Sequence, residues 1–185
     1  MVPVGIGGSD WGPRRERDAV EEVRDVALKF DVVANIDPDD LGRVLARCDP
    51  ERTLFVVASK TFTTQETLSN ATAAKAWLLA GLPSGALHEA HFIASTANVE
   101  AAAAFGILPA NVLPTWDWVG GRYSIWSSVG NTLMLAIVPA GFGEFPVWAA
   151  ASGPPFLPHP RWHNLPAPLA LPRPVPALLT RAAPR

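Results

Sequence analysis

The sequence predicts an α/β fold built on a mostly parallel sheet of five strands. Two observations predict it. Short apolar runs rich in β-branched residues recur between residues 2 and 116, and stretches that are amphipathic or rich in alanine separate them. Strands that alternate with helices form βαβ units with right-handed crossovers, which makes neighbouring strands parallel.

The elements follow in order along the chain. The expected strands are residues 2–6, 31–36, 53–58, 91–95 and 111–116. The expected helices are residues 14–28, 38–48, 68–80 with a start near 63–66, 98–105 and an apolar helix over 125–138. Pro38 followed by two acids suits a helix start, and Asn98 suits a cap. Thr63 and Glu66 have the spacing of a capping box.

Length and composition exclude several classes of protein. The 185 residues can form one domain with a sizeable core, and no apolar run is long enough to span a bilayer. No secretory signal is visible, and the single Cys48 excludes an intrachain disulfide, which fits a reducing, cytoplasmic compartment. The net charge of −2 and the scattered arginines speak against nucleic-acid binding. The four histidines show no metal-binding spacing, so we expect neither metal nor cofactor.

The composition changes at Pro139. Of the 19 prolines, 12 lie in residues 139–185. Proline at this density removes backbone donors and blocks helices. We therefore expect a folded domain over residues 1–138 and a disordered tail, rich in proline, alanine and arginine, over residues 139–185. Because a core strand opens the sequence, we also expect the chain to be a fragment, and a reading-frame shift is one hypothesis for the tail.

The loop Ser59–Thr67 joins the central predicted strand to a helix, and it is rich in hydroxyl groups. The N-terminus of a helix offers free N–H groups and partial positive charge, which suits an anion. Ser59, Thr61 and Thr64 add neutral donors, and Lys60 adds a cation. The pattern predicts a phosphate monoester site, although such clusters also serve only as caps and turns.

Two glycine-rich stretches follow other predicted strands. Gly8 and Ser9 come after the first strand, where glycine lets backbone N–H groups approach a ligand. Gly121 and Arg122 come before the last predicted helix. An arginine is unfavourable at a helix start, which favours a ligand-facing role, and the alternative is a surface arginine packed on Trp116 or Trp118.

Three motifs occur in one order: GIGGSDWGP at residues 5–13, SKTFTTQET at 59–67 and DWVGGRYSIWSSVG at 117–130. Together they resemble the glucose-6-phosphate isomerase (phosphoglucose isomerase) family over residues 2–138. The resemblance implies a sugar-isomerase (SIS) domain, a three-layer sandwich with a five-stranded parallel sheet between helices. It also implies interconversion of glucose 6-phosphate and fructose 6-phosphate in glycolysis, without a cofactor, by an enzyme that is a homodimer.

The resemblance also assigns roles to residues. It implies that the substrate is bound by Gly8, Ser9, Ser59, Lys60, Thr61, Thr64, Gly121 and Arg122. Arg122 would favour the enediolate electrostatically, while the family's glutamate base, its ring-opening histidine and its lysine belong to motifs that do not occur in this sequence. We therefore expect a chain that keeps phosphosugar binding and lacks isomerase activity.

Two other readings are open. Gly5 and Gly7 after a strand suit a dinucleotide-binding oxidoreductase, but Asp10 replaces the third glycine of that fingerprint. A non-catalytic module that binds sugar phosphates is the second alternative.

Overall fold

The computed structural model describes residues 1–9, 29–135 and Val147. The predicted helix 14–28, the end of the predicted helix 125–138 and, apart from Val147, the predicted tail lie outside these residues. By its internal contacts the chain divides into two units, Met1–Pro139 and Ala140–Arg185. All the elements named below belong to the first unit.

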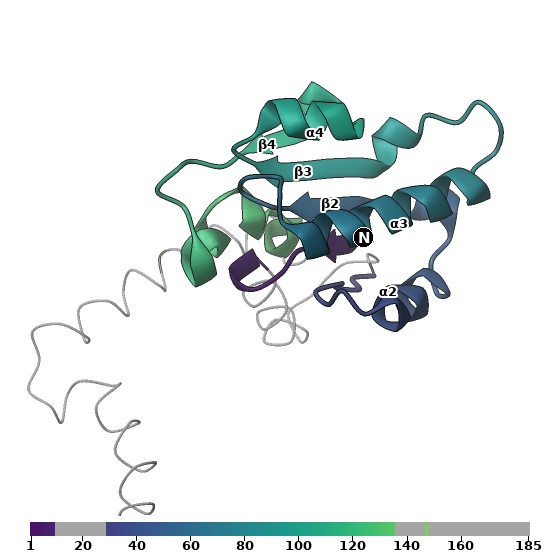
Figure 1. Cartoon of the computed structure of the whole chain (residues 1–185), viewed down its shortest axis with the longest axis horizontal. Helices are drawn as coiled ribbons and strands as arrows, with labels where there is room; N and C mark the ends of the chain where they lie inside the picture. The colour runs from purple at the N-terminus through teal and green to yellow at the C-terminus, as the bar shows by residue number, and fades with distance from the viewer. Residues whose placement is uncertain (10–28, 136–146, 148–185) are drawn as a thin grey trace, which may run out of the picture. The chain divides into compact units, whose positions relative to one another are not determined.

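The sheet is parallel throughout its four strands. They are β1 (Val2–Val4), β2 (Phe55–Ala58), β3 (Phe92–Thr96) and β4 (Val112–Pro114), in the order β1-β2-β3-β4. This confirms the α/β class and the parallel arrangement (Figure 1).

The segment expected as the second strand pairs only briefly. Val33 forms a single parallel bridge with Val4, and its N–H donates to the carbonyl of Pro3 at 2.9 Å. Asn35 then accepts the N–H of Asp37 on its side chain at 3.3 Å, a turn that takes the chain away from β1. Residues 31–33 therefore lie beside β1 at the edge of the sheet, and the predicted strand 31–36 is shortened to one bridge.

The α-helices that lie wholly within the described residues are α2 (Pro38–Leu45), α3 (Gln65–Gly81) and α4 (Val99–Phe105). Short 3₁₀ helices are η2 (Pro50–Arg52), η3 (His88–His91), η4 (Pro109–Asn111), η5 (Gly121–Trp126) and η6 (Ser128–Gly130). Asn98 caps α4 as predicted, because its side chain accepts the N–H of Ala101 at 3.0 Å. No helix of the described residues is both long and apolar enough to cross a membrane.

The predicted start of α3 near residues 63–66 is confirmed, because α3 begins at Gln65, but its predicted capping box and the predicted start of the last helix are wrong. The N-cap of α3 is Thr64, not Thr63, because the hydroxyl of Thr63 is paired with that of Thr61 at 2.6 Å. The apolar helix expected from Ile125 is α-helical only from residue 131. Ser127 is extended (φ −115°, ψ −163°) and caps η6, so it interrupts the helix before that point.

The core lies between one face of the sheet and three helices. Side chains at alternate strand positions, with a period of two, form the sheet side: Val2, Val4, Phe55, Val57, Phe92 and Ala94. Leu41 of α2, Leu78 of α3 and Ala102 of α4 pack against them, and α3 runs across this face (Figure 1). This packing fixes where the N-terminus of α3 lies relative to the strand ends.

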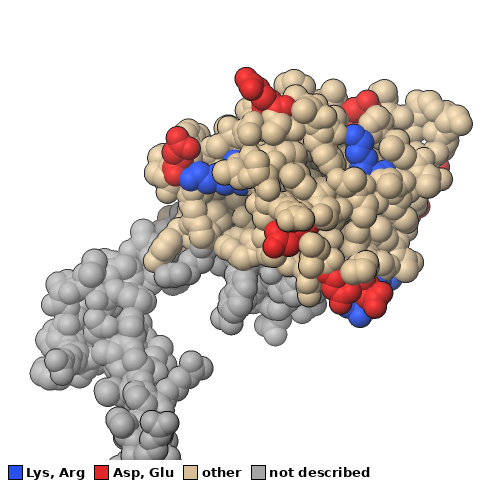
Figure 2. All heavy atoms as spheres, in the orientation of Figure 1, with Lys and Arg blue, Asp and Glu red and all other residues tan. Residues whose placement is uncertain are grey.

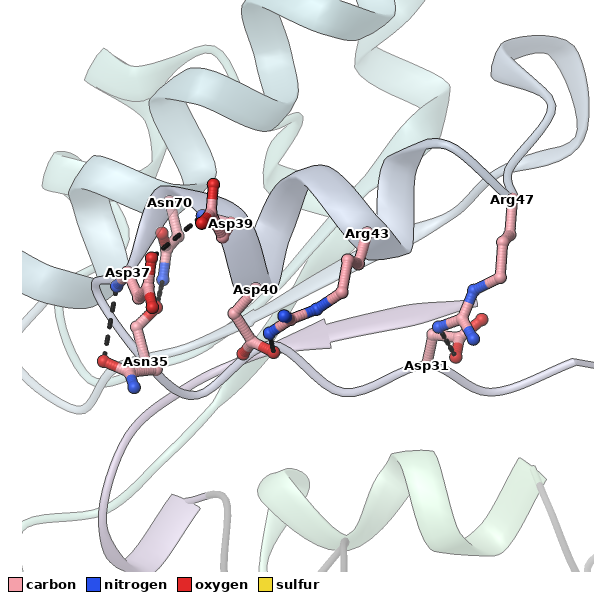
Figure 3. A network of polar contacts seen from close by, with 8 residues as sticks. All are labelled: Asp31, Asn35, Asp37, Asp39, Asp40, Arg43, Arg47 and Asn70. Atoms are coloured by element: carbon pink, nitrogen blue, oxygen red, sulfur yellow. Dashed lines mark hydrogen bonds and ion pairs between the residues drawn. The ribbon is translucent and has the colours of Figure 1, made fainter.

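A polar network holds α2 at the edge of this core (Figure 3). Asp37 caps the helix by accepting the N–H of Asp39 at 3.0 Å. Asn70, which is buried on α3, donates to the carbonyl of Asn35 at 2.7 Å. At the other end of α2, Arg47 pairs with Asp31 at 2.8 Å. The segment between β1 and β2 is thus tied to α3.

Candidate functional site

The site lies where the chain changes direction across the sheet. Residues 31–33, the next segment of the sheet in the sequence after β1, pair with one edge of β1, and β2 pairs with its other edge. In an open parallel sheet such a switch leaves a crevice beyond the carboxyl ends of the two strands, and ligands bind there. The loop with Gly8 and Ser9 follows β1, and the loop Ser59–Thr64 follows β2.

The loop Ser59–Thr64 is folded tightly at the N-terminus of α3. The N–H of Phe62 donates to the carbonyl of Ser59 at 3.1 Å, and Phe62 has a φ of +54° with its ring buried. The hydroxyls of Ser59 and Thr64 are 3.1 Å apart. Because Thr64 makes no side-chain cap hydrogen bond, the first N–H groups of α3 keep their capacity to bind an anion.

Two carbonyl groups of this loop accept hydrogen bonds from neighbouring elements. The carbonyl of Lys60 accepts the N–H of Ala97 at 2.8 Å and the hydroxyl of Thr96 at 3.0 Å. The carbonyl of Thr61 accepts the side-chain amide of Asn98 at 3.1 Å. These contacts with β3 and α4 engage the carbonyl oxygens of Lys60 and Thr61, which removes two acceptors that would repel an anion.

The two glycine-rich stretches meet in the structure. A Cβ added at Gly8 would lie 2.2 Å from the backbone carbon of Gly121, so only glycine fits there. The hydroxyl of Ser124 also donates to the carbonyl of Gly8 at 3.4 Å. Gly121 itself has a φ of +54°, a conformation that favours glycine.

A third connection joins the central loop to the same stretch. The ammonium group of Lys60 donates to the carbonyl of Asp117. Beside this contact lies an open pocket of about 660 Å³, lined by Lys60, Thr61, Thr63, Ala97, Asn98, Val99, Glu100 and Asp117. The sequence motifs pointed to Lys60 and Thr61, but not to Asn98, Glu100 or Asp117 as lining residues. The position of Asn98 just after β3, at the same sheet edge, was the signal available for it.

The predicted site residues therefore come from three loops, after β1, after β2 and around Gly121, and these loops contact one another through Gly8 and Gly121 and through Lys60 and Asp117. Ser59 is buried, Ser9, Lys60 and Thr64 are partly exposed, and Thr61 is exposed. The backbone of Arg122 lies in η5, next to Gly121. On the face that Figure 2 shows, basic side chains lie singly and beside acidic ones. The arrangement places hydroxyl groups at the N-terminus of α3, and Lys60 and Thr61 of the same loop also line the open pocket.

Comparison with known proteins shows the family of the chain. A model of the family described as phosphoglucose isomerase matches residues 1–173. The match continues past residue 138, where the resemblance of the sequence motifs ended. A protein named glucose-6-phosphate isomerase from Burkholderia pseudomallei is 48% identical over 170 residues, which cover 90% of this chain and 31% of that protein. Glucose-6-phosphate isomerase 1 of Thiobacillus denitrificans is 50% identical over 78% of this chain and 26% of its own length.

Solved structures show the same fold. A crystal structure of a glucose-6-phosphate isomerase from Chlamydia trachomatis superposes with a TM-score of 0.72 at 32% identity, over 85% of this chain and 30% of that one. A hypothetical protein from Thermus thermophilus superposes with a TM-score of 0.71 at 29% identity, over 92% of this chain and 40% of that one. The chain thus spans about a third of the length of the curated relatives. It belongs to the phosphoglucose isomerase family.

Proposed function

We propose that this chain binds the phosphate group of glucose 6-phosphate or fructose 6-phosphate at the carboxyl ends of β1 and β2. The observation that carries the proposal is the uncapped N-terminus of α3, bordered by the hydroxyls of Ser59, Thr61 and Thr64. A phosphate there accepts backbone N–H and hydroxyl hydrogen bonds, and the helix dipole favours its charge.

Gly8 and Ser9 border the same phosphate from β1. Gly121 and Arg122 then lie toward the reacting carbons of the sugar, where the arginine favours the charge of an enediolate. Aldose–ketose isomerisation also needs a base to move a proton between neighbouring carbons. Since the family's base motif does not occur in this sequence, we propose that the 185-residue chain binds the substrate without isomerising it.

The proposal includes the wider setting of the family. The four-stranded sheet, with the bridge at Val33 on its edge, then belongs to the five-stranded sheet of a SIS domain, and the protein acts in glycolysis in the cytoplasm, without a cofactor. The family's homodimer is the expected assembly. Family membership favours a sugar phosphate over the dinucleotide reading, whereas a non-catalytic module that binds sugar phosphates is close to the function proposed for this chain.

Calorimetric titration with fructose 6-phosphate tests this proposal. Thr61→Val and Thr64→Val each remove one hydrogen-bond donor to a charged acceptor, so each variant should lose roughly ten- to a hundredfold in affinity. Thr72→Val, at an exposed position farther along α3, is the matched control and should bind as the parent does.

Two results would contradict the proposal. One is a parent chain that binds neither fructose 6-phosphate nor inorganic phosphate. The other is unchanged affinity in both loop variants, which would move the phosphate away from α3.

A further inference from the structure

Three hydroxyl groups form a closed cluster near the carboxyl ends of β3 and β4. The oxygens of Ser95 and Ser128 are 2.6 Å apart, those of Thr115 and Ser128 are 2.8 Å apart, and those of Ser95 and Thr115 are 3.1 Å apart. Ser95 and Thr115 are buried, and Ser128 is partly buried. We call these three side chains the hydroxyl ring.

The three hydroxyls of the ring satisfy one another's hydrogen bonds. Each hydroxyl has one hydrogen to donate and lone pairs to accept, so three groups in a ring each donate once and accept once. Loss of one member leaves the other two with a single hydrogen bond between them, and a buried hydroxyl without its partner is unfavourable. The ring is therefore sensitive to the removal of any one oxygen.

The position of the ring suggests its role. Thr115 and Ser128 are the two ends of the loop 116–127, which carries Gly121 and the backbone of Arg122. The hydroxyl of Ser95, near the end of β3, is hydrogen-bonded to the side chains at both ends of this loop. The carbonyl of Ser95 also accepts the N–H of Ser59 at 3.1 Å. Ser59 is the first residue of the loop Ser59–Thr64. One residue thus connects, by its side chain and its backbone, both loops of the candidate site.

We propose that Ser95, Thr115 and Ser128 are positioning residues that close the base of the loop 116–127 and hold it at a set distance from the loop Ser59–Thr64. The proposal rests on the function proposed above, because a sugar phosphate has to reach both loops. Inorganic phosphate has to reach only one of them. The ring therefore contributes to the preference for sugar phosphate over inorganic phosphate.

The first experiment needs no ligand. Amide hydrogen exchange is measured in the parent, in Thr115→Val and Ser128→Ala, and in Ser69→Ala, an exposed control on α3. We expect exchange in residues 116–127 to become about tenfold faster in both ring variants, as loss of one buried hydrogen bond allows, with the core strands unchanged. Equal exchange in parent and ring variants, or faster exchange throughout the chain, would overturn the positioning role.

The second experiment compares two ligands. The ratio of the affinities for fructose 6-phosphate and inorganic phosphate should fall about three- to tenfold in the ring variants, with inorganic phosphate binding nearly unchanged. Parallel loss of both affinities, or no loss, would contradict the proposal. If Ser128→Ala fails to fold, Ser128→Thr and Thr115→Ser keep the hydroxyls and must preserve both the ratio and the slow exchange.

The two proposals fail separately. A parent chain that binds no phosphate contradicts the proposed function, while the exchange experiment still decides whether the ring holds the loop. If the parent chain binds fructose 6-phosphate and the ring variants keep the same ratio of affinities for fructose 6-phosphate and inorganic phosphate, only the positioning role is contradicted.

Discussion

At the scale of single residues, the contact between Gly8 and Gly121 leaves no space for a side chain. The added methyl group of Gly8→Ala would lie 2.2 Å from backbone, so one of the two loops has to move. We expect an overpacking cost of about 1–3 kcal/mol in the free energy of unfolding, measured by urea denaturation, together with loss of sugar-phosphate affinity.

Gly42→Ala is the matched control for this prediction. Gly42 lies in α2 with nothing within 4 Å of its added Cβ, so alanine should stabilise the protein by roughly 0.5–1 kcal/mol. A Gly8→Ala variant as stable as the parent would show that the Gly8–Gly121 contact is looser than described.

Thr67 is a second residue whose environment is unusual. It lies in the first turn of α3, is 2% exposed, and its hydroxyl has no hydrogen-bond partner among the described residues. Valine has nearly the same shape without the polar oxygen. Thr67→Val should therefore raise the free energy of unfolding by about 1 kcal/mol in urea denaturation, whereas a clear loss of stability would reveal a partner for this hydroxyl.

At the scale of elements, α2 depends on its cap rather than on its surface ion pair (Figure 3). Asp37→Ala removes the acceptor of the Asp39 N–H and should lower the free energy of unfolding by about 1 kcal/mol. Arg43→Ala removes only an exposed pair with Asp40, at 3.5 Å, and should change stability by less than about 0.5 kcal/mol. Thermal or urea unfolding measures the loss of stability in both variants. An equal loss in Asp37→Ala and Arg43→Ala would refute the capping argument.

At the scale of the whole molecule, the chain holds a third of the length of its curated relatives, together with the three loops of the candidate site. We expect the purified 185-residue chain to bind fructose 6-phosphate and to show no turnover in a coupled isomerase assay. Proton transfer needs a base within hydrogen-bond reach of the substrate, and general acid–base catalysis contributes about 10²–10⁴-fold.

The assay needs controls for contaminating host enzyme. Glu100 and Asp117 line the pocket, and Glu144 is the last acid of the sequence. Turnover that persists on further purification and disappears in Glu100→Gln, Asp117→Asn or Glu144→Gln would identify that carboxylate as the base and contradict the expectation.

The amino-acid sequence alone predicts the parallel α/β order, the start of α2, the cap of α4, and the loops that carry the candidate site. These features follow from signals between near neighbours: strand and helix periodicity, a cap residue beside its helix, and glycine or hydroxyl residues after a strand. Parallel connectivity then places the loops after β1 and β2 at one sheet edge without knowledge of a tertiary contact.

The contacts that hold those loops follow from the three-dimensional packing and not from the local sequence. Thr64 rather than Thr63 occupies the N-cap position of α3, without a side-chain cap hydrogen bond, and the hydroxyl of Thr63 is paired with that of Thr61. Gly8 faces Gly121, and Ser95 joins Thr115 to Ser128, across separations that no local pattern encodes. The physical reason is that a hydroxyl or a glycine suits many turns equally, and its partner is chosen by packing of segments far apart in the chain.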